Sequence, residues 1–134
     1  MNAIERLGPL AGRVMMAALF IPSGFSKLAG FQGTVGYIAS KGLPLPQLGA
    51  VAAIVVELLV AAALLLGWRT RWAALILVLF TLAAAVLFHD YWAVPPEQKM
   101  MQAINFWKNV AIAGGLLFVA AHGPGPYAVD REGR

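Results

Sequence analysis

The chain has 134 residues, of which 60% are hydrophobic and 12% are charged, and its formal net charge is +4. A soluble domain this short leaves too much of its surface in water to bury so many apolar side chains, so the composition excludes an ordinary soluble domain and indicates a protein whose main solvent is the lipid bilayer. The basic residues are too thinly spread for a nucleic-acid partner. The absence of cysteine excludes disulfides and thiolate metal sites. His89 and His122 lie too far apart to predict a metal site.

Four apolar segments of near-membrane length predict an all-α membrane protein, with one domain over residues 1–134 folded as a bundle of four transmembrane helices. The expected spans are residues 7–26, 48–66, 72–88 and 102–121. The first span has a weak basic start, no clear cleavage site and Arg13 inside it, so we expect a retained anchor and not a signal peptide.

The connection between the first two spans is long enough to form a helix of its own. Phe31, Val35 and Ile38 recur at helical spacing, which predicts a short amphipathic helix over residues 31–41 at the membrane interface. A loop is the alternative, because two glycines within the segment weaken a helix.

The remaining breaks carry strong turn signals. The stretch GWRTR at residues 67–71 predicts a tight turn, and Pro95-Pro96 prevents a helix from continuing between the third and fourth spans. Glycine and proline in HGPGPY, residues 122–127, end the fourth span. The last six residues, VDREGR, are expected to form a frayed polar tail.

The arginines and lysines differ between the two sides of the predicted bundle. Four spans place both termini on one side, together with Arg6, Arg69, Arg71, Arg131 and Arg134. The other side receives Lys27, Lys41 and Lys99. Because basic residues are enriched on the cytoplasmic side of membrane proteins, we expect both termini to be cytoplasmic.

Three ionisable residues, Arg13, Glu57 and Lys108, lie inside the spans. A charge at this depth costs about 3 kcal/mol, so Glu57, near the midplane, should face the bundle and find a cationic partner. Side chains lean toward the N-terminus of their own helix. Because the second and fourth spans both start outside, this lean favours a Glu57–Lys108 pair over a Glu57–Arg13 pair.

Polar residues on the four spans fall on stripes that converge on a polar seam inside the apolar bundle. The deep part of this seam is expected to hold Glu57, Arg13, Lys108, Asn109 and Thr81. Its outer mouth is expected to hold Lys27, His89, Asp90 and Trp92. The candidates for ligand binding or proton exchange are Glu57, Lys108, Arg13, Asn109, His89, Thr81 and Lys27, whereas no catalytic residue is assigned.

A purely structural interpretation competes with this one. A buried pair between Glu57 and a cation can serve only to fix which helices pack together. Arg13 and Lys108 can also extend their charged ends to opposite membrane interfaces and have no further role.

Several segments resemble the DoxX family of small bacterial membrane proteins. These are GRVMMAALFIPSGFSKLAGFQGTVGYIASKGLPLP, the span that holds Glu57, LLLGWRTRWAALIL, LFHDYW and NFWKN. The resemblance extends from about Leu7 to Tyr127, and it lies in the order and spacing of the segments together. It implies a four-helix protein of the bacterial inner membrane. The family takes its name from a subunit linked to thiosulfate:quinone oxidoreductase, and some members are associated with redox and oxidative-stress proteins.

Three hypotheses about function follow from the polar seam and the resemblance. The first is a subunit of a membrane redox assembly that binds a quinone-like lipophile, with electrons supplied by a redox partner protein because the sequence has no haem or cluster motif. It needs no intrinsic cofactor besides the quinone. The alternatives are a non-enzymatic scaffold for a partner protein and, third, a small proton-coupled transporter. Besides the bilayer, a second copy of the chain is a further partner to consider. Whether the chain is an enzyme is left open.

Overall fold

The structure is a computed structural model that describes residues 1–131; Arg134, which the charge pattern assigns to the cytoplasmic side, lies outside that range. The described residues form helices and no strand. In chain order the elements are α1 (Ala3–Ala29), α2 (Phe31–Ser40), α3 (Pro46–Val55), the π-helical turn η1 (Val56–Val60), α4 (Ala61–Leu66), α5 (Thr70–Phe88) and α6 (Pro96–His122). Because α3, η1 and α4 form one continuous helix, four helices are long and apolar enough to cross a membrane. The predicted four-helix fold, with a short helix after the first span, is confirmed.

Local sequence explains where the helices start and stop. α1 begins with a capping box: the Asn2 side chain accepts a hydrogen bond from the Glu5 N–H at 2.9 Å, and the Glu5 carboxylate accepts one from the Asn2 N–H at 2.8 Å. Gly67 ends α4 with a φ of +70°, which glycine adopts at little cost. Pro96 starts α6, where its missing N–H leaves no helical bond unmade.

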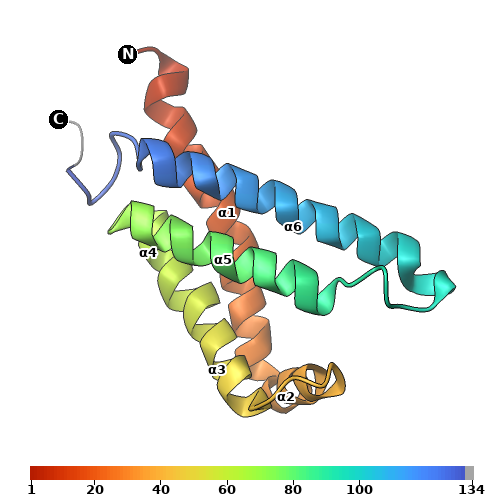
Figure 1. Cartoon of the computed structure of the whole chain (residues 1–134). Coiled ribbons are helices and arrows are strands. Elements are labelled where there is room, and N and C mark those ends of the chain that lie inside the picture. Colours follow the sequence, from red (N-terminus) through yellow and green to blue (C-terminus); the bar gives the residue numbers. More distant parts are fainter. Residues whose placement is uncertain (132–134) are drawn as a thin grey trace.

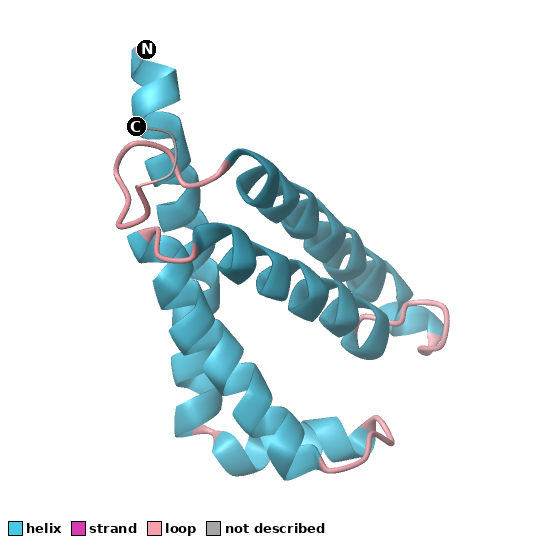
Figure 2. Ribbon diagram, turned by 60° about the vertical axis from the view of Figure 1, so that its left-hand side comes forward, coloured by secondary structure: helices cyan, strands magenta, loops and turns pink. Residues whose placement is uncertain are grey.

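The helices form two antiparallel pairs (Figures 1 and 2). In the first pair, α1 runs beside the span made of α3, η1 and α4, with Arg13 near Leu64 and Lys27 near Glu57. The second pair is α5 with α6. The two pairs lie close together near the termini and diverge at the other end, where α2 lies beside the start of α3.

The core lies where the two pairs meet. The main cluster takes one large buried residue from each span, namely Phe20, Leu64, Leu77 and Leu116. A second cluster, Val35, Ile38 and Ala50, holds α2 against α3. The side chains of the main cluster pack where the two pairs meet, so they do not fill the space between the pairs at the diverging end.

The segment after α6 is hydrogen-bonded to the bundle, so the prediction of a frayed tail is wrong for Val129 and Asp130, while residues 132–134 of that tail lie outside the described residues. The N–H groups of Val129 and Asp130 donate to the carbonyls of Leu66 (3.1 Å) and Gly67 (2.7 Å). The Asp130 carboxylate accepts hydrogen bonds from the N–H groups of Arg69 and Thr70 and from the Thr70 hydroxyl. The tail therefore caps the start of α5.

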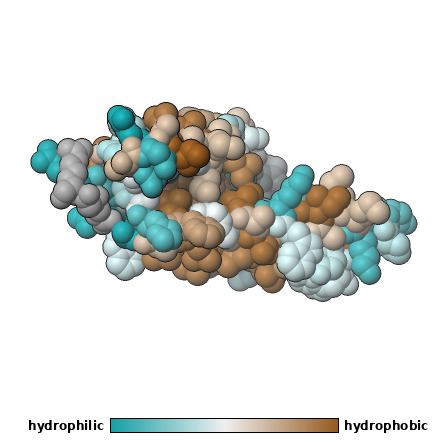
Figure 3. Space-filling view, turned by 90° about the horizontal axis from the view of Figure 1, so that it is seen from above, coloured by the Kyte–Doolittle hydropathy of each residue, from teal (hydrophilic) through white to brown (hydrophobic). Residues whose placement is uncertain are grey.

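The surface matches a bilayer environment. Seen from above, hydrophobic residues cover most of the visible face, while hydrophilic residues gather near the termini and around the connection between α5 and α6 (Figure 3). Large apolar residues such as Leu59, Leu79 and Phe118 are exposed on the helices. In water such exposure would favour aggregation, whereas in lipid it is the expected outer surface.

Candidate functional site

Glu57 lies inside the bundle, as predicted, and is only 5% exposed. It belongs to η1, and a π-helical turn of this kind often occurs at functional sites in helices. Gly24 of α1 passes so close to η1 that a Cβ atom at this glycine would lie 3.0 Å from the Glu57 Cβ. The absent side chain lets the two backbones approach and brings the polar residues of α1 within reach of Glu57.

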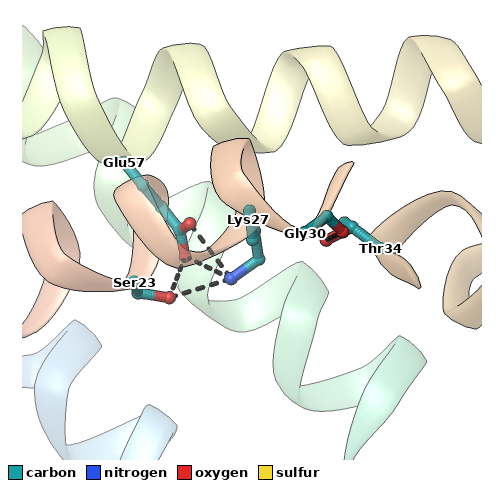
Figure 4. Close-up of polar contacts among 5 residues, drawn as sticks. All are labelled: Ser23, Lys27, Gly30, Thr34 and Glu57. Atoms are coloured by element: carbon teal, nitrogen blue, oxygen red, sulfur yellow. Dashed lines mark hydrogen bonds and ion pairs between the residues drawn. The ribbon is translucent and has the colours of Figure 1, made fainter. Parts of the chain in front are cut away.

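Glu57 forms an ion pair with Lys27, and Ser23 bonds to both (Figure 4). The Lys27 Nζ lies 3.1 Å from Glu57 Oε1 and 3.0 Å from Oε2, and it donates to Ser23 Oγ at 2.8 Å. The Ser23 hydroxyl in turn donates to Glu57 Oε1 at 3.1 Å. Because α1 and η1 are antiparallel and side chains lean toward the N-terminus of their helix, Lys27 and Glu57 lean toward each other.

The predicted pairing of Glu57 with Lys108 or Arg13 is wrong. Arg13 is 1% exposed and donates to backbone carbonyls at the terminal end of the bundle. Its acceptors are the carbonyl oxygens of Leu64, Leu65, Pro124 and Tyr127. Lys108 is exposed on the outer face of α6, in a shallow groove beside Trp107. The inner face of α6 carries Ala113 and Leu116, so Lys108 lies on the wrong side of the helix to reach Glu57.

The ion pair lines a cavity of about 630 Å³ between the two helix pairs. All four spans and α2 contribute to its mostly apolar wall. Five of the seven predicted site residues line it, namely Lys27, Glu57, Thr81, His89 and Asn109. Arg13 and Lys108 do not. Three residues predicted for the deep part of the seam, Glu57, Thr81 and Asn109, thus line the cavity, whereas Arg13 forms a separate structural contact. Of the predicted mouth, Lys27 and His89 line the cavity and Asp90 and Trp92 do not.

The wall opposite the ion pair carries polar groups with unused hydrogen-bonding capacity. Thr81 of α5 is 3% exposed, and among residues 1–131 its hydroxyl has no hydrogen-bond partner. The Asn109 side-chain amide contacts the Thr81 carbonyl only at 3.5 Å. His89 Nδ1 lies 2.8 Å from Gln102 Oε1, which fixes the orientation of the ring. These groups can bind a polar atom that enters the cavity.

Two contacts join α2 to the end of α5 where the helix pairs diverge. The rings of Tyr37 and Phe88 lie with their centroids 5.4 Å apart, and Lys41 Nζ bonds to Asp90 Oδ1 at 3.0 Å. The hydrogen bond from Lys41 lowers the pKa of Asp90 below its ordinary value. Both lysines near the cavity, Lys27 and Lys41, are thus paired with carboxylates.

Sequence reasoning placed Lys27 at the mouth of the seam and missed its partner. The predicted first span stopped at residue 26, whereas α1 continues to Ala29, so Lys27 was assigned to the outer mouth of the seam and not to its deep part. One signal was present: Ser23 and Lys27 are four residues apart on the stripe that also contains Gly24 and Phe20. Within residues 1–131, no three histidine, aspartate or glutamate side chains lie close enough to hold a metal ion.

The amino-acid sequence matches a family model and several known proteins. Residues 8–90 match the family model of DoxX. The chain is 43% identical over 123 residues to the inner membrane protein YphA of Escherichia coli K12. This alignment covers 92% of the present chain and 88% of YphA. It is 38% identical over 131 residues to the inner membrane protein YqjF of the same organism, covering 98% and 95%. A Surfeit locus protein 4 homolog of Schizosaccharomyces pombe is 26% identical over 92% of this chain but 36% of its own length. No solved structure matches.

Proposed function

The chain belongs to the DoxX family of inner membrane proteins, and from this premise we propose that it binds a small quinone-like lipophile in the cavity beside Glu57. The proposal rests on one observation above all. An apolar cavity lined by four membrane-spanning helices contains on one wall an ion pair whose carboxylate is buried, and on the other a hydroxyl that has no partner within residues 1–131.

The size and lining of the cavity suit such a ligand. Small-molecule sites are typically apolar cavities of about 300–1,000 Å³ with a few polar groups that orient the ligand. A buried hydroxyl without a partner costs about 1–3 kcal/mol. A ligand oxygen that accepts a hydrogen bond from Thr81 would remove this cost, so the empty bonding capacity of Thr81 favours binding.

Quinone chemistry matches the groups on the walls. A quinone has an apolar ring and two carbonyl oxygens, which Thr81 and Asn109 can bind as hydrogen-bond donors. Its reduction takes up protons, and a positioned carboxylate such as Glu57 can exchange them. Electrons would come from a redox partner protein, in line with the redox and oxidative-stress associations that the family resemblance implies.

We also propose that both termini face the cytoplasm. The Arg6 side chain donates to the Tyr127 hydroxyl at 3.0 Å, so the two ends of the described chain lie at the same side. Arginines gather at this end, and the lysines lie toward the other. The enrichment of basic residues on the cytoplasmic side supports this orientation.

Filling the cavity tests the function directly. Ala84 lines the cavity, so Ala84→Phe should abolish binding of a short-tailed ubiquinone to the purified protein in nanodiscs, measured by calorimetry. Ala111→Phe, on the exposed face of α6, adds the same ring to a spanning helix and should leave binding unchanged.

A second variant makes the result independent of steric damage. Thr81→Val keeps the side-chain shape and removes only the unpartnered hydroxyl. We expect about fivefold weaker quinone binding, because one hydrogen bond is worth about 1 kcal/mol, with thermal stability unchanged or higher. Full quinone affinity in folded Ala84→Phe protein would refute the cavity as the site and leave the scaffold as the better hypothesis.

A further inference from the structure

Lys27 and Glu57, a basic and an acidic residue, both line the cavity, and their charges neutralise each other. An ammonium group has three N–H donors. The Lys27 ammonium lies within 3.1 Å of three oxygens, Ser23 Oγ and both carboxylate oxygens of Glu57. Two of these contacts, to Ser23 Oγ and Glu57 Oε1, are hydrogen bonds, whereas Glu57 Oε2 is an ion-pair contact and accepts no hydrogen bond within residues 1–131. The carboxylate balances the charge of the ammonium, so the pair offers an incoming anion no unbalanced positive charge.

From this geometry, and resting on the proposed function, we infer that the Lys27–Glu57 pair sets the charge selectivity of the cavity: it admits lipophiles with a neutral polar head and excludes those with an anionic head. The pair acts on the ligand through its charge balance. The ligand's own hydrogen bonds come from the opposite wall.

An anionic head meets two obstacles. If it approaches Lys27 while Glu57 stays in place, the repulsion by the carboxylate offsets the attraction to the ammonium, so the anion gains little in return for the hydration that it loses. If it displaces Glu57 from Lys27, the carboxylate is left buried without a counter-charge, which is also costly.

A neutral head meets neither obstacle. It can accept a hydrogen bond from the Thr81 hydroxyl and from the Asn109 amide without disturbing the ion pair. Two further titratable groups line the cavity: His89 is held by Gln102 on the α5 side, and Tyr37 comes from α2. The donors of Thr81 and Asn109 therefore match a neutral hydrogen-bond acceptor.

The inference predicts that removing one charge reverses the selectivity. Dodecanol and dodecanesulfonate share a tail, and the sulfonate is ionised at every usable pH. Wild-type protein in nanodiscs should bind dodecanol at least about tenfold more tightly than the sulfonate. Glu57→Gln leaves Lys27 without its counter-charge, so this variant should bind the sulfonate at least about tenfold more tightly than wild type does.

Three further variants separate a change in charge selectivity from misfolding. Lys27→Gln leaves the opposite charge and should instead gain affinity for dodecyltrimethylammonium. The double variant Glu57→Gln with Lys27→Gln should lose both gains. Lys108→Met changes the charge by one unit on the exposed face of α6 and should leave the preference as in wild type.

The outcomes separate the two proposals. If wild-type protein binds neither the short-tailed quinone nor dodecanol, the proposed function fails. If it binds them but takes the sulfonate equally well, or if neither single variant shifts its preference in the stated direction, the charge-selectivity inference is overturned while the binding function stands.

Discussion

Arg13 shows how a single residue at membrane depth can be structural. Its guanidinium has five N–H donors and no acceptor, which suits a cluster of backbone carbonyls. Two of its acceptors, the carbonyls of Leu64 and Leu65, lie at the C-terminal end of α4, where helices present unpaired carbonyl groups and partial negative charge. The other two, from Pro124 and Tyr127, belong to the segment after α6. Arg13 thus joins three parts of the chain.

Removing the Arg13 side chain should therefore destabilise the fold without touching the cavity. Arg13→Met removes the Arg13 donor from four carbonyls, of which that of Leu64 still accepts from the Gly67 N–H. Because each buried or partly buried carbonyl left without a donor costs about 1–3 kcal/mol, we expect a loss of at least about 3 kcal/mol in the free energy of unfolding. Equilibrium unfolding in mixed dodecyl sulfate micelles measures it, with Lys108→Met as the matched control. A loss below about 1 kcal/mol would contradict the structural role, and a selective loss of quinone affinity would return Arg13 to the ligand site.

The sequence predicted that Glu57 is buried, but it did not predict that Lys27, and not Lys108, is its partner. The burial of Glu57 followed from its cost in lipid, and its predicted lean toward the N-terminus of its own helix agrees with the contact to Lys27. The partner depended on which residues of neighbouring helices lie at the same height. That register is set by the Gly24 contact and by the exact length of α1, neither of which hydropathy reveals.

At the scale of elements, the segment after α6 works as a cap for α5. Partial burial alone would raise the pKa of Asp130, but the hydrogen bonds from Thr70 and Arg69 outweigh it and hold the pKa below its ordinary value. A carboxylate at the start of a helix also meets the positive end of the helix dipole. Composition alone could not predict this contact, because VDREGR has the polar character of a disordered tail.

Asp130→Ala should cost about 1 kcal/mol of stability at neutral pH, the usual value of an N-terminal cap. Because the pKa is lower in the folded chain, the contribution is present above about pH 4 and is lost as the pH falls through the folded pKa. Thermal unfolding between neutral and acidic pH measures it. The variant should lose less stability than wild type on acidification, although Asp90 keeps part of the acid sensitivity. Identical acid profiles would show that Asp130 does not cap α5 in solution.

The π-helical turn η1 is a second feature of this scale that the sequence does not predict. The stretch VELLV has the same apolar character as its α-helical neighbours. The turn matters because it lies opposite Gly24 and carries Glu57. The element was predictable as a span, whereas the local change in winding that presents its one carboxylate to Lys27 was not.

For the molecule as a whole, the four spans were predictable because hydropathy is a local property that each segment carries independently. The divergence of the two helix pairs was not, since helix tilt follows from side-chain packing. The main cluster draws the pairs together at one end, and the contacts of α2 with Phe88 and Asp90 bridge them at the other. The cavity between them is a product of the complete fold.

The orientation of that fold in the membrane can be measured cleanly because the chain has no cysteine. Gln98 and Trp68 are exposed at opposite ends of the bundle, and replacing either leaves every arginine and lysine in place. In intact bacterial cells, a membrane-impermeant maleimide should label Gln98→Cys at once and Trp68→Cys only after the inner membrane is permeabilised, because the arginine-rich end faces the cytoplasm. The reverse pattern would place the termini outside. The divergent end of the bundle would then face the cytoplasm, and a redox partner would have to be sought there.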